Sequence, residues 1–451
     1  MRSYHVSARK PSSKSSSDRD SDLSDYEDIC PILHFDTFVD ITAPEPEVKK
    51  AVAIAIGRLG IRSWRSMPLS LSCDLSLTRI SGALTNAVYL VSPPCSTTAK
   101  KILLRVYGPH VSHLIDRRLE LQTIQKLSSH HIGPRLLGTF SNGRFEQWLE
   151  SSALTREEIR DPITSRCIAR RMRKLHETII LSQAEKQSIL VWEYWDKWVI
   201  IARQVIQRRQ KKKCRKVPGL DEPAFIDANW ALFEKGVQSY REWLLALPRD
   251  YLDDVVFAHN DTQYGNILRL KVPSDRHLKP SHRELVVIDF EYAGPNPRAF
   301  DLANHFCEWM ANYHDTVAPH ILDPASYPKP DDISRFLNEY LEHGRMLSGM
   351  HLNVESQQKL NDDTEIKRLA DQVLAWRPAS HLLWVAWGAV QAMEDADDSG
   401  DWENIADTPD FFNYLGYAED RMKLFFGDLC TIGLLKAEEM VSGGVKFVYS
   451  E

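Results

Sequence analysis

The sequence predicts an α+β fold with two lobes, in which a small antiparallel β-sheet lobe with one helix precedes a larger, mostly helical lobe. Short strand-like apolar runs crowd into the first 150 residues, and helical periodicity dominates after them. Two short apolar runs in the second half are the exception, because each ends in a cluster of polar side chains. With 451 residues, of which 43% are hydrophobic, the chain is long enough to build a core in both lobes.

The first lobe is expected over residues 46–150. Val48, Val52, Ile56 and Leu59 recur at helical spacing and indicate a first helix. A second, amphipathic helix is expected at 111–127, inside the sheet sequence, and Gly133-Pro134 follows it as a breaker. Strands are expected at 75–80, 87–91, 101–107, 136–140 and 144–149.

The second lobe is expected over residues 151–440. Helices are predicted at 160–180, 185–208, 225–246, 299–313, 331–348, 365–394 and 410–427. Residues 1–29 are rich in Ser and Asp and too polar to bury a core, so we expect a disordered tail whose serines are open to phosphorylation. A lobe of strands followed by a lobe of helices matches the bilobal kinase architecture.

Composition excludes several classes of protein. The net charge of −6 argues against bulk nucleic-acid binding. The seven cysteines are scattered, odd in number and never in a Cys-x-x-Cys pair, which indicates a reducing compartment without a disulfide framework or zinc site. No apolar run approaches the roughly 20 residues that span a bilayer, and the N-terminus lacks a signal-peptide pattern. We therefore expect a cytoplasmic protein.

The polar clusters after the two apolar runs indicate phosphoryl transfer from ATP. Asp261 and Asn266 follow the first run, and Asp289 ends the second. An Asp in this position can accept the proton of a hydroxyl, while an Asn and a second Asp supply the oxygen ligands that magnesium prefers. His259 is expected to pack and hydrogen-bond within the loop and not to act as a base.

The first lobe offers residues for the nucleotide. Arg105 lies in a strand with apolar neighbours and needs a partner for its charge, which Glu120 on the following helix is placed to supply. A strand cation paired with a helix Glu grips ATP phosphates in protein kinases. An ordinary structural salt bridge is the competing interpretation. The first hairpin turn offers small and polar residues whose backbone can approach phosphates, namely Ser81, Gly82, Thr85 and Asn86.

These stretches resemble the choline and ethanolamine kinase family. The segments that carry the resemblance are His259–Asn266 and Ile288–Tyr292 with its continuation Asn296–Trp309. Shorter matches are Ile80–Gly82, Leu103–Gly108, Gly133–Leu136, Gly143–Gln147 and Ala379–Trp384. The similarity covers roughly residues 75–427, and Ala83 departs from a Gly that is frequent in the family.

The resemblance implies ATP- and Mg²⁺-dependent phosphorylation of choline, the first step toward phosphatidylcholine. It implies that Asp261 is the catalytic base, that Asn266 and Asp289 hold the metal, that Arg105 contacts ATP phosphates and that Gln147 lies against adenine. It also implies a possible homodimer, for which the sequence shows no interface signature.

Choline carries a permanent positive charge without N–H donors, so its site needs aromatic faces and carboxylates. Trp384 and Trp387 lie three residues apart on one expected helix face, and Glu308 shares a helix face with Asp301. Taken one at a time, the aromatic residues are equally well explained as core. Gln263 is placed to position the substrate hydroxyl. The remaining candidate contacts to the head group are Tyr292, Tyr313, Phe412, Tyr414 and Tyr417.

Three alternatives stay open. Ethanolamine could occupy the same site, because a carboxylate can accept hydrogen bonds from its primary ammonium. The basic run 208–216 could bind RNA, anionic lipid or an import receptor, although such a run is more often a solvated helix end. A non-catalytic scaffold with a kinase fold is the third, but it would not need Asp261, Asn266 and Asp289 together.

Overall fold

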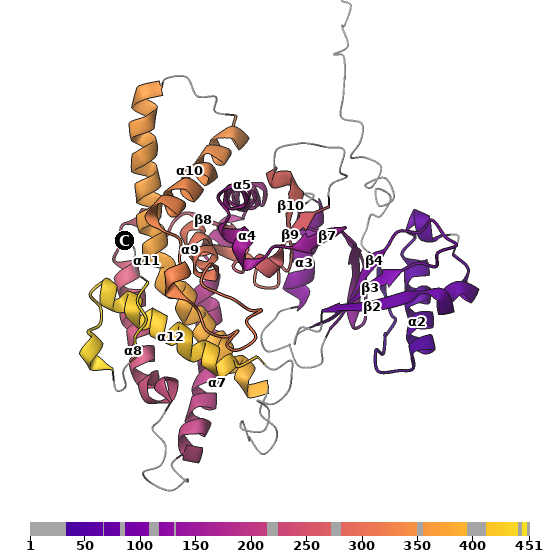
Figure 1. The fold of residues 1–451 in the computed structure, drawn as a ribbon, viewed down its shortest axis with the longest axis horizontal. Coiled ribbons are helices and arrows are strands. Elements are labelled where there is room, and N and C mark those ends of the chain that lie inside the picture. Colours follow the sequence, from indigo (N-terminus) through magenta and orange to yellow (C-terminus); the bar gives the residue numbers. More distant parts are fainter. Residues whose placement is uncertain are drawn as a thin grey trace, which may run out of the picture. The chain divides into compact units, whose positions relative to one another are not determined.

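The computed structural model describes residues 33–65, 67–81, 86–107, 117–129, 132–213, 224–271, 281–349, 355–394, 412–440 and 444–448. The chain forms two compact units (Figure 1). The first comprises Met1–Pro109 with Arg135–Trp148, and the second comprises His110–Pro134 with Leu149–Glu451. The segment 110–134 lies within the expected first lobe by sequence and groups with the second unit.

A six-stranded sheet organises the first unit, in the order β1-β5-β6-β4-β3-β2. Its neighbours are antiparallel except β1 and β5, which run parallel. The antiparallel register of β4 with β6 puts Arg144 opposite Arg105. The strands are β1 (His34–Phe35), β2 (Ser76–Ser81), β3 (Asn86–Ser92), β4 (Ile102–Tyr107), β5 (Leu136–Phe140) and β6 (Gly143–Gln147).

One helix, α2 (Glu45–Arg58), covers this sheet, with the short 3₁₀ turns η1 (Arg62–Trp64) and η2 (Leu69–Asp74) after it (Figure 1). Its start is favoured by a proline in the first turn and by Glu45 and Glu47, whose charges suit a helix N-terminus. Val48, Val52 and Ile56 lie on one face and are buried in the same core as strand residues of β4 and β6. This core holds the strand that carries Arg105.

The second unit is mostly helical. The helices that surround the site are α5 (Pro162–Thr178), α7 (Leu190–Lys213), α9 (Arg298–Glu308), α11 (Glu355–Glu394) and α12 (Tyr414–Thr431). The others are α3 (Arg117–Ser129), α4 (Arg156–Arg160), α6 (Gln183–Lys186), α8 (Phe225–Leu245) and α10 (Pro330–Leu347). Short 3₁₀ turns are η4 (Arg249–Tyr251), η5 (Tyr264–Asn266), η6 (His282–Glu284), η7 (Pro324–Ser326) and η8 (Ala437–Glu439).

Two small sheets interrupt these helices and carry the polar loops. One has the order β10-β9-β7, with β7 (Ser151–Ala153), β9 (Ile267–Leu270) and β10 (Leu285–Val287). The other pairs β8 (Val255–Ala258) with β11 (Gly294–Pro297) in antiparallel register. The two candidate segments therefore begin where β8 and β10 end.

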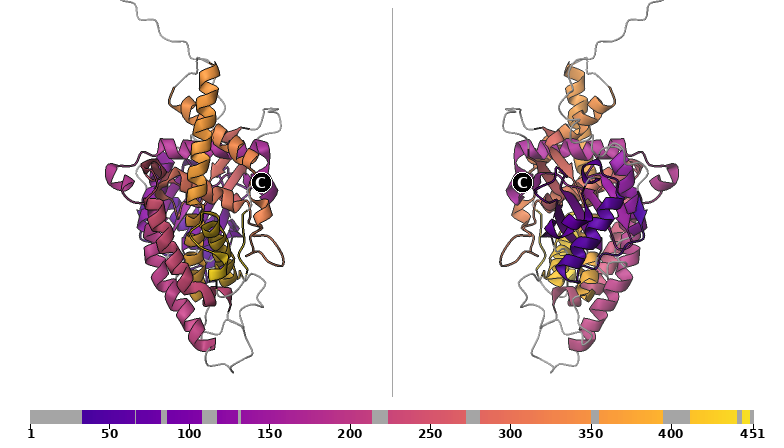
Figure 2. Two further views of the ribbon diagram at one scale, coloured as in Figure 1. Left: turned by 90° about the vertical axis from the view of Figure 1, so that its left-hand side faces the viewer. Right: turned by 90° about the vertical axis from the view of Figure 1, so that its right-hand side faces the viewer.

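The helix α11 runs through the middle of this unit and is the long orange helix in both views of Figure 2. Its central part packs against α7, α9 and α12, and its earlier part packs against α10. Trp376 and Trp198 are fully buried in this core together with phenylalanines from several helices. Aromatic burial on this scale holds α9, α11 and α12 in fixed positions relative to one another.

Most predicted elements agree with the structure to within a few residues. The helix expected at 299–313 ends at Glu308, and the helix expected at 365–394 begins ten residues earlier, at Glu355. The strands β8 and β10 correspond to the two apolar runs that precede the polar clusters, whereas the short strands β1, β7, β9 and β11 were not predicted. Residues 1–29, the turn residues Gly82, Thr85 and positions 214–216 of the basic run lie outside the described residues.

The structure bears on two expectations from the sequence, one about membrane-spanning segments and one about the cysteines. Within the described residues, no helix is long and apolar enough to cross a membrane. Five of the seven cysteines are described, and all five are free thiols: Cys73, Cys95, Cys167, Cys307 and Cys430.

Candidate active site

The loop that follows β8 is fixed by buried hydrogen bonds. His259 is fully buried, its Nε2 bonds the Ile288 carbonyl at 3.0 Å, and its Nδ1 accepts from the Asp261 N–H at 3.2 Å. These two bonds define a neutral tautomer with its proton on Nε2. Burial lowers the pKa of His259, although Asp301 opposes the shift. The expectation that His259 is a loop-holding residue and not a base agrees with this geometry.

Asp301, on α9, accepts hydrogen bonds from the backbone of the same loop. Its carboxylate accepts the backbone N–H of His259 at 3.1 Å and of Asn260 at 2.7 Å, and it bonds His176 Nε2 at 2.9 Å. Burial opposes ionisation of Asp301, yet the His176 bond and the other donors hold its pKa below the usual range. The carboxylate stays charged and fixes the loop backbone.

Asn260 adopts a left-handed backbone with φ of 66°. Such a conformation costs a non-glycine residue about 1–3 kcal/mol and persists only when its surroundings over-determine it. Here the side chain donates to the Tyr292 carbonyl at 2.8 Å and accepts from Asn296 at 2.8 Å. Asn304 donates to the Asn260 carbonyl at 3.0 Å. The strained turn aims the following residue, Asp261, away from the core.

Asp261 and Asn266 form a pair across this loop. The Asn266 amide nitrogen donates to the Asp261 carboxylate at 2.7 Å and to the Asp261 carbonyl at 3.0 Å. The amide oxygen of Asn266 therefore faces away from Asp261. Asp289, after β10, is the second non-glycine residue with a left-handed backbone, with φ of 65°. Both loops thus present an acidic residue on or next to a strained turn.

The charges around Asp261 are crowded. Its pKa is raised well above the usual value, first by loss of solvation and then by repulsion from Glu308, Asp289 and Glu291. The repulsion between these carboxylates would fall if a cation bound among them. The site therefore has the charge that a divalent cation would balance.

The donor set fits magnesium. Asp289, Asn266 and Asp261 offer only oxygen ligands, which hard cations prefer. Within the described residues, no group of three or more His, Cys, Asp or Glu side chains forms a metal cage by itself. Magnesium is usually held through one or two carboxylates, waters and substrate phosphates, so an incomplete protein cage suits it better than zinc or calcium.

An aromatic cluster lies beside these loops. Trp384 and Trp387 of α11 have ring centroids 5.5 Å apart, and Trp387 lies 5.5 Å from Tyr414 and 6.0 Å from Tyr417 of α12. Further ring contacts join Tyr292 to Trp384 at 5.5 Å, Phe412 to Tyr414 at 5.0 Å and Tyr313 to Phe412 at 6.3 Å. We call these seven residues the aromatic cluster: Tyr292, Tyr313, Trp384, Trp387, Phe412, Tyr414 and Tyr417. All seven were candidates from the sequence.

Glu308 lies at the base of the aromatic cluster and is 1% exposed. Its Oε1 bonds Arg421 at 2.5 Å, and its Oε2 accepts from the Tyr313 hydroxyl at 2.7 Å. Arg421 also donates to the Tyr417 hydroxyl at 3.1 Å. We expected Glu308 to supply negative charge near the transfer site, and the structure pairs that charge with the buried guanidinium of Arg421. The pair holds two of the aromatic rings in place.

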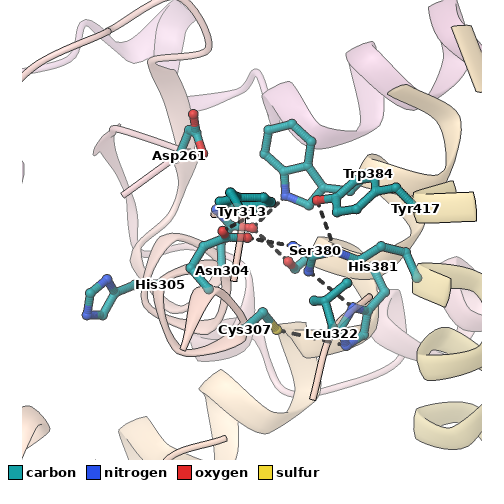
Figure 3. Close-up of polar contacts among 12 residues, drawn as sticks. Asp261, Asn304, His305, Cys307, Tyr313, Leu322, Ser380, His381, Trp384 and Tyr417 are labelled. Carbon is teal, nitrogen blue, oxygen red and sulfur yellow. Dashed lines mark hydrogen bonds and ion pairs between the residues drawn. The ribbon is translucent and has the colours of Figure 1, made fainter. Parts of the chain in front are cut away.

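Asn304 connects the loop of Asp261 to the aromatic cluster. Its amide nitrogen donates to the Asn260 carbonyl, and its Oδ1 accepts from Ser380 at 2.7 Å and from Trp384 Nε1 at 2.8 Å. Figure 3 shows these bonds as dashed lines from Asn304 to the α11 residues Ser380 and Trp384. Trp387 adds a second connection, because it donates to the Tyr292 hydroxyl at 2.8 Å. One hydrogen-bond network thus positions both the acid and the rings.

Gln263 has a local role in the described geometry. Its Oε1 accepts from the Gly265 N–H at 2.9 Å and caps the short turn η5. A Cβ at Gly265 would lie 2.9 Å from that oxygen, so glycine allows the turn to close. The side chain is half-buried next to Asp261.

The nucleotide candidates of the first unit lie on β4 and β6. Arg105 is 9% exposed, and its Nε lies 3.6 Å from Glu146 Oε1, which also accepts from Arg144 at 2.6 Å. Two buried guanidinium groups therefore lie against one carboxylate. Gln147 ends β6, with its Oε1 3.4 Å from the Arg135 N–H.

The remaining nucleotide candidates are described only in part. Ser81 and Asn86 end β2 and begin β3, but their side chains, like that of Glu120 on α3, lie outside the described residues. The expected pair of Arg105 with Glu120 therefore stays a prediction. Glu146, two positions after Arg144 on the same strand face, is the carboxylate that sequence reasoning did not assign to Arg105.

Sequence reasoning also missed Arg421, Asn304 and His176. The i+4 spacing of Tyr417 and Arg421 was a usable signal, because it places a cation on the helix face of an aromatic candidate. Asn304 lies inside the motif that carried the resemblance, but no spacing rule connects it to Trp384, 80 positions away. His176 lies 125 positions from Asp301 and carries no local signal.

Comparison with known proteins agrees with this geometry. A family described as choline/ethanolamine kinase matches residues 77–426. A choline kinase of Schizosaccharomyces pombe is 36% identical over 88% of this chain and 92% of its own length. An ethanolamine kinase of Saccharomyces cerevisiae is 31% identical over 90% of this chain and 81% of its own length.

Solved structures support the fold. The crystal structure of a choline kinase from Cryptosporidium parvum aligns with a TM-score of 0.65 and 20% identity, covering 85% of this chain and 97% of that one. An ethanolamine kinase from Plasmodium vivax aligns with a TM-score of 0.59. The two-unit architecture is thus the protein-kinase-like fold that the sequence predicted. Because the family match extends over most of the chain, this chain belongs to the choline/ethanolamine kinase family.

Proposed function

We propose that the protein transfers the γ-phosphoryl group of ATP to the hydroxyl of choline, with Mg²⁺ as cofactor, in the first step toward phosphatidylcholine. The observation that carries the choice of substrate is the aromatic cluster, whose seven rings adjoin the loop of Asp261 through Asn304 and Tyr292. A cationic head group against these faces would direct its hydroxyl arm toward the acidic loops.

Asp261 is the proposed general base. Its carboxylate is oriented by Asn266 at 2.7 Å and is half-buried, so it can accept the substrate hydroxyl proton as the oxygen attacks phosphorus. The fixed Asn260 backbone and the Asp301 anchor keep this carboxylate in place during transfer. Gln263, next in the loop, is a proposed contact to the hydroxyl.

Asn266 and Asp289 are the residues that would hold magnesium through their side-chain oxygens. When bound, the metal would neutralise phosphate charge and lower the repulsion around Asp261. Arg105 and the turn at Ser81–Asn86 are the proposed phosphate contacts, with Glu120 as the proposed partner of Arg105. Gln147 is the proposed contact for adenine.

Choline is favoured over ethanolamine by the way Glu308 is engaged. Both of its oxygens already accept strong hydrogen bonds, from Arg421 and Tyr313. A quaternary ammonium has no donors and needs only faces and a nearby negative field, and its methyl groups gain from apolar contact. A primary ammonium has three donors, for which this arrangement leaves few acceptors.

Ethanolamine remains the second candidate substrate, because a relative at 31% identity is an ethanolamine kinase. The test is a comparison of kcat/KM for the two alcohols with purified full-length protein, ATP and Mg²⁺, followed by ADP release. We expect a clear preference for choline. An equal or higher kcat/KM for ethanolamine would reverse the assignment, and absence of ADP release with either alcohol would favour a non-catalytic scaffold.

The free cysteines and the scattered cysteine pattern favour a reducing compartment, so we propose that the protein acts in the cytoplasm.

A further inference from the structure

A group of basic side chains gathers on the second unit, where α5 packs against both η6 and α10. Arg171 and Lys174 lie one turn apart on α5, His282 and Arg283 lie on η6, and His343 lies on α10. We call these five residues the α5 basic cluster. None of them belongs to the proposed transfer site.

The charges of this cluster are not balanced by the protein. Two neighbouring cations on α5 are paired, because Arg170 bonds Glu339 at 2.5 Å and Arg173 bonds Glu177 at 2.5 Å. In contrast, the side chains of Arg171, Lys174 and Arg283 form no hydrogen bond or ion pair with the parts of the chain that the structure describes. Three like charges held together by the fold repel one another and favour binding of an anion.

Arg171 and Lys174 are both partly withdrawn from water. Burial lowers the pKa of Arg171 to about 10, and the pKa of Lys174 falls because of burial and then because of Arg171 and Arg283. A half-buried guanidinium without a counter-charge is unfavourable, because burial of a charge needs a partner. The fold therefore holds partly buried positive charge at a position where a bound anion would stabilise it.

The two imidazoles complete the arrangement. His282 and His343 have ring centroids 4.9 Å apart in an edge-to-face arrangement. His343 is 7% exposed, and neither of its ring nitrogens finds a hydrogen-bond partner within the described chain. A polar group buried without a partner is unfavourable. A neutral imidazole also retains one N–H donor, which an oxyanion could accept.

We propose that the α5 basic cluster binds a phosphate-type oxyanion, either inorganic phosphate or a phosphomonoester. Such a dianion has enough acceptor oxygens for a guanidinium fork, an ammonium and an imidazole at once. It would also supply the counter-charge that Arg171, Lys174 and Arg283 lack. The same helix carries His176, which bonds Asp301 at 2.9 Å, so the cluster lies on the element that supports the catalytic loop.

The test is thermal unfolding of the full-length protein, without nucleotide, in potassium phosphate, sodium sulfate and potassium chloride at equal ionic strength. Phosphate should raise Tm in a saturable way, chloride should not, and sulfate should act like phosphate. O-phosphoserine then separates the two sources: a tighter apparent Kd than that of inorganic phosphate assigns the site to a phosphomonoester, and a weaker one assigns it to the free ion.

The variant Arg171→Gln/Lys174→Gln should lose most of the phosphate-dependent rise in Tm. Without phosphate it should be at least as stable as the unmodified protein, because it removes mutual repulsion. Lys186→Gln/Lys197→Gln, at two exposed positions of the same unit that form no ion pair with the described residues, is the matched control and should keep the full response. In NMR, phosphate should raise the pKa of His282, which lies at about 4 through burial and the neighbouring His343 and arginines. An unchanged phosphate response in Arg171→Gln/Lys174→Gln, or no saturable response in the unmodified protein, would overturn the proposal.

Discussion

At the residue scale, the position of Asp261 depends on a strained neighbour. Asn260 takes a left-handed backbone, and four hydrogen bonds to its backbone and amide groups keep it there. Within the described residues Asp261 makes three hydrogen bonds, two to its backbone and a single one, from Asn266, to its carboxylate. The residue that would perform chemistry is therefore less constrained than the one before it, which suits a carboxylate that has to accept a proton.

Replacing Asp261 with Asn tests its role as general base. The substitution keeps the size of the side chain and a hydrogen bond toward Asn266, but it removes the proton acceptor. We expect kcat to fall by about 10²–10⁴-fold, the usual contribution of a general base. Initial-rate kinetics with choline measures this change, and circular dichroism checks that the fold is retained.

The exposed Asp371, on α11 away from the loops, is the matched control for this substitution. Asp371→Asn should leave kcat unchanged. A loss of less than about tenfold in Asp261→Asn would assign the proton to another acceptor.

Trp387 tests the cation site at the same scale, because it is half-buried and touches Tyr292, Tyr414 and Tyr417. Trp387→Ala should raise the KM for choline by about 3- to 30-fold, which corresponds to a cation–π contribution of about 0.5–2 kcal/mol. The KM for ATP should change much less, and Trp387→Phe should recover part of the loss because it restores a ring.

Trp243, a half-buried tryptophan on α8, provides the control variant Trp243→Ala. It should affect neither KM. Equal increases in both Michaelis constants for Trp387→Ala would indicate that Trp387 has a packing role only.

At the element scale, α9 joins the catalytic loop to the aromatic cluster. Asp301 and Asn304 bond the loop, while Glu308, at the end of the same helix, bonds Arg421 on α12 and the Tyr313 hydroxyl. All residues of α9 except Arg298 are buried. A shift of α9 would move Asp261 and the aromatic cluster together. The distance between them is therefore set by this one helix.

The buried pair of Glu308 and Arg421 gives a prediction about this element. Arg421→Met leaves Glu308 buried without its counter-charge and should destabilise the protein by about 3–5 kcal/mol. Urea unfolding followed by tryptophan fluorescence measures the difference. The double variant Glu308→Gln/Arg421→Met removes both charges and should recover most of that stability.

The same double variant separates stability from substrate binding. We expect it to fold but to bind choline more weakly, because the ion pair that holds the rings of Tyr313 and Tyr417 in place is gone. If Arg421→Met alone cost less than about 1 kcal/mol, comparable to an exposed pair, the ion pair would not be the connection between α9 and α12 that the structure indicates.

Sequence patterns predicted the elements better than their connections. The apolar periodicity of α9 and α11 and the polar ends of β8 and β10 are local signals, so the helices and the positions of Asp261 and Asp289 could be predicted. The bond from Asn304 to Trp384 and the pair of Glu308 with Arg421 join residues 80 and 113 positions apart. No local pattern encodes such contacts, and for this reason the partner of Glu308 could not be predicted.

At the scale of the whole molecule, stability in acid depends on buried neutral imidazoles. His259, His305 and His381 are all 0% exposed. Burial lowers the pKa of each, to about 4 for His305. In the unfolded chain a histidine takes up its proton near pH 6.5. Stability from these residues is therefore complete above about pH 6.5 and is lost as the pH falls from there toward 4.

Two buried carboxyl groups act in the opposite direction. The pKa of Asp261 and of Asp428 is raised, mainly by burial, so both take up protons in the folded state more readily than in the unfolded chain. The pH dependence of the free energy of unfolding therefore combines opposing contributions. The difference between the unmodified protein and a single-residue variant isolates the contribution of one residue.

The variant His305→Asn allows this comparison. The Nδ1–H of His305 donates to the Thr262 carbonyl at 2.9 Å, and its Nε2 accepts from Trp309 at 3.4 Å, so the ring is held neutral. His305→Asn keeps a donor for Thr262 but cannot take up a proton. Between pH 7.5 and pH 4.5, the unmodified protein should lose about 2–3 kcal/mol more stability than the variant, as guanidinium unfolding would measure.

His34→Asn, at an exposed histidine of the first unit, should show no such difference. Parallel acid profiles for the unmodified protein and His305→Asn would mean that His305 is protonated in the folded state without cost, which the two bonds to its ring do not allow.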